Sequence, residues 1–132
     1  RTLVNTVTHV STPILTVTGA NTIFTTAPDR GRFFPIAIWF RPSINTASNA
    51  TPLVRIGYTN SGVAFSDFVS SYTFLSSRLA GQYFDIPLKA DATGTPPTGR
   101  FSAPPSTAIV FYVATASVGA SAGEVIVSGF YA

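Results

Sequence analysis

The sequence predicts an all-β fold, an antiparallel β-sandwich of the jelly-roll type with about eight to nine strands. Three observations lead to this prediction. Apolar residues do not recur at the three- and four-residue spacing of an amphipathic helix. β-branched and aromatic residues dominate the segments that look ordered. Gly, Pro, Asn and Ser interrupt these segments at a spacing of roughly 8 to 12 residues, which is typical of sandwiches.

Nine segments have the composition of strands. Residues 2–10 (TLVNTVTHV) partly alternate apolar and polar side chains, as a strand with one solvated face does. Residues 14–18 (ILTVT) and 21–26 (NTIFTT) are short runs rich in β-branched residues. Residues 34–41 (FPIAIWFR) and 108–115 (AIVFYVAT) are nearly continuous apolar runs. The other predicted strands are 53–58 (LVRIGY), 72–75 (YTFL), 83–88 (YFDIPL) and 124–131 (EVIVSGFY).

Length favours a single domain that covers residues 1–132. A chain of 132 residues buries roughly two-thirds of the surface of its unfolded form, so it can hold a core without covalent staples. It contains no cysteine. Residues 91–106, rich in Pro and Gly, are predicted to form one long loop. Residues 1–20 are either the first two strands of the sandwich or an arm that pairs with a neighbouring chain.

Charged residues make up 10% of the chain, against roughly 25% in an ordinary soluble domain. The net charge of +3 is spread singly along the sequence and forms no cluster of the kind that binds a phosphate backbone. No apolar run approaches the roughly 20 residues that span a bilayer. We therefore expect a soluble protein that binds neither nucleic acid nor membrane.

Two segments, residues 36–40 and 108–114, are apolar at every position that would face either side of a sheet. A two-layer sandwich covers only one of those sides. Each outward large side chain would leave on the order of 1.5 to 3 kcal/mol of burial unused. This pattern favours an oligomer, with a closed ring as the usual form. The alternative is that the long loop or the N-terminal segment covers that side.

Groups suited to catalysis are few. His9 is the sole histidine, which excludes a multi-histidine metal site within one chain, and we expect it to be structural or on the surface. Tyr58, Tyr72 and Tyr83 either pack in the core or stack on sugar rings. The sequence predicts no enzyme, no cofactor and no metal site, since none of its five acids lies within four residues of another: Asp29, Asp67, Asp85, Asp91 and Glu124.

Three segments taken in order resemble a known family. They are FFPIAIWFRPSI (33–44), LVRIGYTNSGVAFSDFVSS (53–71) and the closing pair AIVFYVATASVG and GEVIVSGFYA. This succession is similar to the small jelly-roll domains of tailed-bacteriophage virion proteins, namely capsid decoration (cement) proteins, head fibres and tail-fibre tips. The resemblance covers about three-quarters of the chain and leaves out its first 31 residues.

The resemblance implies a non-enzymatic virion structural protein that assembles as a homotrimer. Asp67 matches the aspartate that follows the Ile-Gly strand of the family, where it would accept backbone N–H bonds from the preceding turn. The residues implied at the subunit interface are Trp39, Phe40, Phe111 and Tyr112.

Two functions are compatible with the resemblance. A capsid decoration protein would bind the exterior of the major capsid protein shell and stabilise it, since a ligand of the assembled shell shifts the equilibrium toward assembly. Such a protein would be soluble in the host cytoplasm before assembly. A tail-fibre or head-fibre tip would instead bind host surface glycan through Tyr58, Arg100 and Phe101. We favour decoration because the long loop carries only Arg100 and Phe101 besides small residues and an aspartate.

Overall fold

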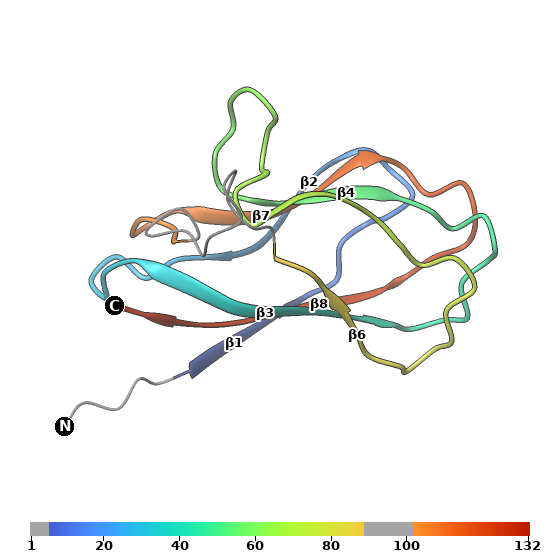
Figure 1. Ribbon diagram of the computed structural model, residues 1–132, viewed down its shortest axis with the longest axis horizontal. Helices are drawn as coiled ribbons and strands as arrows, with labels where there is room; N and C mark the ends of the chain where they lie inside the picture. Colours follow the sequence, from blue (N-terminus) through green and yellow to red (C-terminus); the bar gives the residue numbers. More distant parts are fainter. Residues whose placement is uncertain (1–5, 89–101) are drawn as a thin grey trace.

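The structure is a computed structural model that describes residues 6–88 and 102–132. All regular secondary structure in these residues is β-strand, and the predicted β-sandwich is confirmed (Figure 1). The strands are β1 (Thr6–Ser11), β2 (Gly19–Thr25), β3 (Phe33–Pro42), β4 (Leu53–Gly57), β5 (Val69–Thr73), β6 (Phe84–Ile86), β7 (Ala108–Thr115) and β8 (Gly123–Tyr131).

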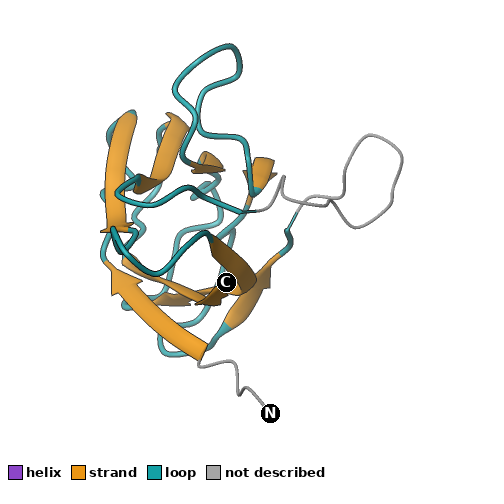
Figure 2. Ribbon diagram, turned by 90° about the vertical axis from the view of Figure 1, so that its left-hand side faces the viewer, coloured by secondary structure: helices purple, strands orange, loops and turns teal. Residues whose placement is uncertain are grey.

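Two four-stranded antiparallel sheets form the layers, in the orders β1-β8-β3-β6 and β2-β7-β4-β5 (Figure 2). We call them the first and the second sheet. The pairing is nested: β1 pairs with β8, β2 with β7, β3 with β6 and β4 with β5. The first half of the chain therefore lies against the second half, and each sheet is built from strands far apart in sequence.

The core lies between the two sheets and is rich in aromatic rings. Phe33 and Phe40 point inward from β3, Phe111 points inward from β7, and all three are 0% exposed. Phe74 contacts both Phe40 and Phe111 edge to face, with ring centroids 5.1 and 6.4 Å apart. Such contacts add to the roughly 1.5 to 3 kcal/mol that burial of each large side chain contributes. These rings join the two layers.

Most strand boundaries shift by one to three residues from the predicted ones, and β6 covers only Phe84–Ile86 of the predicted 83–88. Two differences matter most. Residues 14–18 were predicted as a strand, but they form bends between β1 and β2. Leu15 anchors this connection in the core at 2% exposed, while Ile14 and Val17 stay 60% and 61% exposed. Secondly, β5 begins at Val69, three residues before the predicted start. In the N-terminal segment, Thr6–Ser11 pairs with β8 of the same chain, and residues 1–5 lie outside the described part.

Candidate interaction surfaces

One end of the sandwich gathers four loops from distant parts of the sequence. Because strand direction alternates along the chain, every connection that leaves an odd-numbered strand emerges at the same end. These connections, residues 12–18, 43–52, 74–83 and 116–122, form what we call the loop end, at the right of Figure 1. The loops from even-numbered strands emerge at the opposite end.

Backbone hydrogen bonds join the four loops to one another. The N–H of Ser117 donates to the carbonyl of Leu15 at 2.8 Å, and the N–H of Thr46 donates to the carbonyl of Arg78 at 2.9 Å. The N–H of Ala47 donates to the carbonyl of Ala120 at 3.1 Å. The hydroxyl of Thr46 is buried and donates to the carbonyl of Leu75. The loop end is therefore held in one arrangement before any partner binds.

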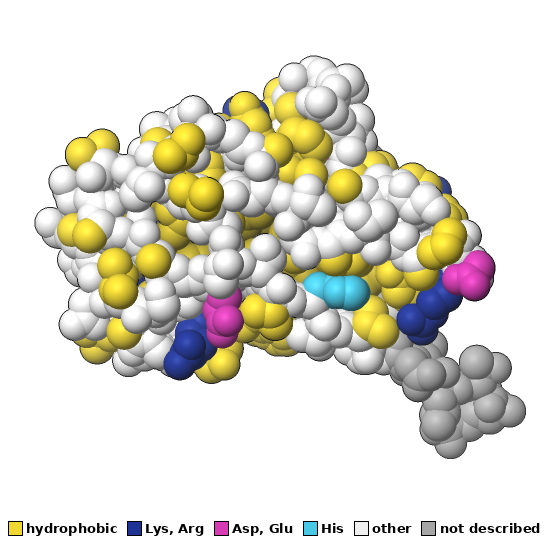
Figure 3. All heavy atoms as spheres, turned by 180° about the vertical axis from the view of Figure 1, so that it is seen from behind, with side chains coloured by type: hydrophobic (Ala, Val, Ile, Leu, Met, Phe, Trp, Pro, Cys, Tyr) yellow, Lys and Arg dark blue, Asp and Glu magenta, His cyan; other side chains and the backbone are white. Residues whose placement is uncertain are grey.

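Exposed apolar side chains cluster at the loop end, with Val118 87% exposed. Only one charged residue, Arg78, lies in these four loops, and its guanidinium sits 4.5 Å from the centroid of the Phe84 ring. In Figure 3 this end, at the left, is largely white with separate yellow side chains. The exposed aliphatic residues of the loop end are Ile14 (60%), Val17 (61%), Ile44 (41%), Leu79 (54%) and Val118 (87%).

This surface is not predicted from the sequence. Its apolar residues are isolated in four separate connections, mostly among Ser, Thr, Asn, Ala or Gly, so no local pattern marks the surface. Ile14 and Val17 were assigned to a strand because their segment is rich in β-branched residues. The signal that remains in the sequence is weaker: these four connections carry one charged residue between them.

The four residues predicted at a subunit interface do not lie on one face. Phe40 and Phe111 are 0% exposed in the core, so their assignment to the interface is wrong. Side chains alternate along a strand, and their neighbours Trp39 and Tyr112 therefore point outward. Trp39 belongs to the first sheet and Tyr112 to the second, so these two face opposite sides of the sandwich.

The second sheet already covers part of its outward aromatic surface. The ring of Phe65, from the loop after β4, lies against Tyr112 with centroids 5.5 Å apart. The guanidinium of Arg55 lies 5.8 Å from the centroid of the same tyrosine. Tyr112 is consequently half-buried by its own chain.

Asp67 makes the bonds that the sequence analysis expects of it. Its Oδ2 accepts the N–H of Tyr58 at 2.7 Å and that of Thr59 at 2.8 Å, and its Oδ1 accepts the Thr59 hydroxyl at 2.8 Å. Asp67 belongs to the connection between β4 and β5, which projects at the top of Figures 1 and 2. Its environment is that of a structural residue.

The glycan-binding residues of the alternative function are not brought together in the described chain. Tyr58 is half-buried and packs against Phe68, with centroids 5.9 Å apart. Arg100 and Phe101 lie outside the described residues.

His9 forms part of the contact between the sheets. Its ring stacks on Phe24 with centroids 3.7 Å apart and planes 4° from parallel. The Nε2 atom is buried without a hydrogen-bond partner, and burial lowers the pKa of His9 below its ordinary value of 6.5. A neutral ring fits this position best.

Residues 6–88 and 102–132 contain no group of three or more His, Cys, Asp or Glu side chains that could hold a metal ion. The same residues contain no helix with the length and hydropathy needed to cross a membrane. Comparisons with protein-family models, with curated proteins and with solved structures find no match.

Proposed function

We propose that this chain is a non-enzymatic virion structural protein, a capsid decoration protein that binds the outside of the shell as a homotrimer. The loop end is the surface that binds the shell. The observation that carries the proposal is the combination found there: five exposed apolar side chains, one charged residue and a backbone fixed by hydrogen bonds between loops.

The size of the loop end supports a protein partner. The exposed apolar surface of its five large residues is on the order of 400 Å², about the apolar share of the roughly 800 Å² that one partner contributes to a stable interface. Depletion of charge is typical of the centre of such interfaces. A preorganised surface also loses less conformational entropy on binding.

The nested strand pairing supports the jelly-roll part of the proposal. Jelly rolls are eight-stranded double sheets built from Greek keys. The orders β1-β8-β3-β6 and β2-β7-β4-β5 have that number of strands and bring the first and last strands together in one sheet.

The homotrimer requires a contact other than the one predicted from sequence. We propose that the subunit contact lies on the first sheet, at the opposite end of the sandwich from the loop end. There Phe34 and Phe130 lie side by side across β3 and β8 and stack with centroids 5.3 Å apart. A β-bulge between Pro35 and Ala37 leaves Ile36 unpaired and 53% exposed beside them. Outward aromatic and aliphatic side chains of this kind are typical of subunit contacts.

Binding to shells that lack the protein tests the function. Purified chain would be mixed with such shells and separated by sedimentation. Wild-type protein should sediment with the shells, and Val118→Asp and Ile14→Asp should each reduce binding at least about tenfold, because a carboxylate would have to be desolvated at the contact. Val63→Asp is the matched control, since Val63 is 60% exposed on the projecting loop at the other end. Equal binding of all four proteins, or none by wild type, would refute the proposal.

A further inference from the structure

A row of side chains crosses the outer face of the first sheet near the loop end. The strand registers place Val10 of β1 opposite Ile126 of β8, Ile126 opposite Trp39 of β3, and Trp39 opposite Asp85 of β6. Two residues further along, Arg41 of β3 is opposite Glu124 of β8. Residues two apart on a strand share a face, so both rows face outward together.

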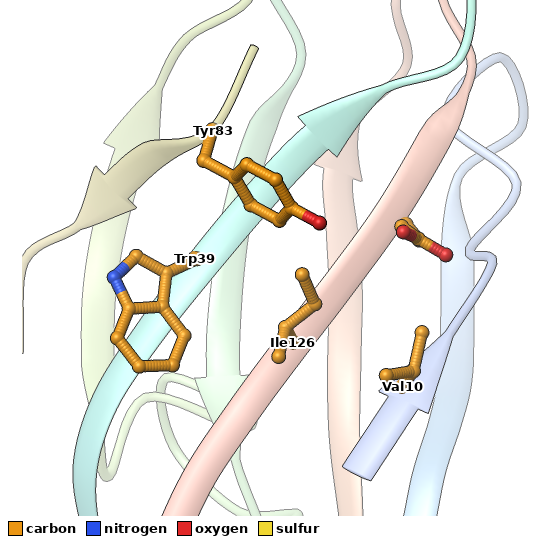
Figure 4. Close-up of a pocket in the computed structure, with 5 residues that line it drawn as sticks. Val10, Trp39, Tyr83 and Ile126 are labelled. Atoms are coloured by element: carbon orange, nitrogen blue, oxygen red, sulfur yellow. The ribbon is translucent and has the colours of Figure 1, made fainter. Parts of the chain in front are cut away.

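Val10, Ile126, Trp39 and Glu124 of these rows line a hollow of about 440 Å³, which we call the Trp39 hollow. That volume is within the range of small-ligand sites. Figure 4 shows the rings of Trp39 and Tyr83 on one side of Ile126 and the side chain of Val10 on the other. Tyr83 is 63% exposed. The residues that line the hollow are Val10, Trp39, Tyr83, Glu124 and Ile126.

Charged groups border the aromatic rings and keep much of their hydrogen-bonding capacity. Arg41 and Glu124 form an ion pair with a long N···O separation of 3.8 Å, and their side chains are 40% and 32% exposed. The same guanidinium lies 5.8 Å from the centroid of Tyr83, which orients that ring. Asp85 is exposed, and its carboxylate makes no hydrogen bond or ion pair with the part of the chain that the structure describes.

We propose that the Trp39 hollow binds a neutral saccharide. A pyranose ring has an apolar C–H face and a rim of hydroxyl groups. The C–H face would lie against the indole of Trp39 and the ring of Tyr83, both of which offer flat apolar surface with little conformational entropy to lose. The hydroxyls would donate to the carboxylates of Glu124 and Asp85, which only accept, and would accept from the guanidinium of Arg41.

The charges select this ligand over others that stack on aromatic rings. Nucleotides and acidic glycans would bring anionic groups next to Glu124 and Asp85, which repels them. Quaternary ammonium ligands are bound by rings that surround the cation, whereas Trp39 and Tyr83 lie on one side of the hollow and Arg41 already occupies the neighbourhood of Tyr83. The bordering charges also distinguish the hollow from the loop end, which carries one charged residue, since the centres of protein interfaces are depleted in charge.

The site is independent of the proposed function. Tyr83 lies at the end of the 74–83 loop, but neither the five exposed aliphatic residues of the loop end nor the Phe34–Phe130 pair lines the hollow. The hollow can therefore bind sugar whether or not the chain binds a shell. The fibre-tip function implied glycan binding at Tyr58, Arg100 and Phe101, and none of these three lines the Trp39 hollow. Tyr83, which does line it, was one of three tyrosines that the sequence allowed either to pack in the core or to stack on sugar rings.

Intrinsic fluorescence gives a direct test, because Trp39 is the sole tryptophan of the chain. The full chain would be titrated with neutral oligosaccharides of glucose, galactose, mannose and N-acetylglucosamine, each up to millimolar concentration. Heparin tetrasaccharide and choline are the comparison ligands. At least one neutral oligosaccharide should change the emission saturably, and heparin and choline should not.

Variants then locate the binding. Tyr83→Ala should weaken the affinity for the responding saccharide on the order of tenfold, as expected for loss of one stacked ring. Glu124→Gln and Asp85→Asn should weaken it less, and Trp39→Ala should abolish the heat of binding in calorimetry. Val63→Ala is the control and should bind as wild type. Three results would overturn the proposal: no response to any neutral probe, a response to choline or heparin alone, or saccharide binding unchanged in Trp39→Ala and Tyr83→Ala.

Discussion

The carboxylate of Asp67 occupies the space beside Gly57 that a side chain would need. A Cβ at position 57 would stand 2.5 Å from Oδ2 of Asp67 and 2.6 Å from its backbone nitrogen. Real Cβ atoms do not approach other atoms so closely, so something would have to move. The close approach lets the carboxylate reach the N–H groups of Tyr58 and Thr59, which begin the projecting loop.

Gly57→Ala should therefore destabilise the fold by about 1 to 3 kcal/mol, as overpacking of a filled site does. The neighbouring atoms include backbone, which cannot rotate away. Chemical denaturation measures the free energy of unfolding. Gly62→Ala would be strained for another reason, because Gly62 has φ +60°. The control variant is therefore Ala80→Gly, which changes a residue in an exposed turn. A Gly57→Ala protein as stable as wild type would mean that the loop does not need this contact.

Asp67→Ala should also destabilise, by about 1 to 3 kcal/mol, because two backbone N–H groups lose their charged acceptor. Asp67→Asn keeps one acceptor oxygen and should cost less. If Asp67 instead served a ligand at this loop, both variants would unfold like wild type in the same denaturation experiment.

His9 makes stability depend on pH in a defined direction. Burial lowers the pKa of His9 in the folded state below the ordinary 6.5, so just below pH 6.5 the unfolded chain binds more protons than the folded chain. The neutral His9 ring makes its full contribution to the free energy of unfolding above pH 6.5. That contribution decreases as the pH falls below 6.5, and it stops decreasing once the pH is below the folded-state pKa. His9→Phe keeps a ring against Phe24 and should remove this dependence. An unchanged pH profile in His9→Phe would contradict the assignment.

Self-association should depend on outward residues and be insensitive to core ones. Ile36→Asp, at a side chain 53% exposed, should lower the native mass measured by light scattering from trimer to monomer while leaving the fold intact. Phe111→Ala should cost about 3 to 5 kcal/mol of stability through a core cavity, yet any folded protein should keep the native mass. A trimeric Ile36→Asp protein would exclude the Phe34–Phe130 contact.

Much of the fold was predictable because strand composition and turn residues agree along most of the chain. The segment 108–115 coincides with β7, and Leu53 begins β4 as predicted. The strand predicted at residues 14–18 was wrong because its β-branched composition suits a strand and a connection equally well. In this chain the segment is a connection that one buried leucine anchors. Periodicity could not decide whether Trp39 or Phe40 faces inward, since both neighbours are apolar and a shift of one residue reverses the faces. In the folded chain Phe40 is 0% exposed and Trp39 is half-buried, so Phe40 is the residue that faces inward.

The loop end and the Trp39 hollow were beyond sequence reasoning for a different reason. Val118 and Ile14 are 104 residues apart in sequence, and Val10 and Trp39 are separated by a strand that belongs to the other sheet. Only the nested pairing of strands brings each set together. Local patterns carry no information about contacts of that range.

The most direct measurement is labelling of intact virus particles with a gold-conjugated antibody to this chain, viewed by electron microscopy. A capsid decoration protein should place gold over the whole head, and particles made without the chain should carry none. Gold confined to the tail end, or absent from every particle, would contradict the proposed function.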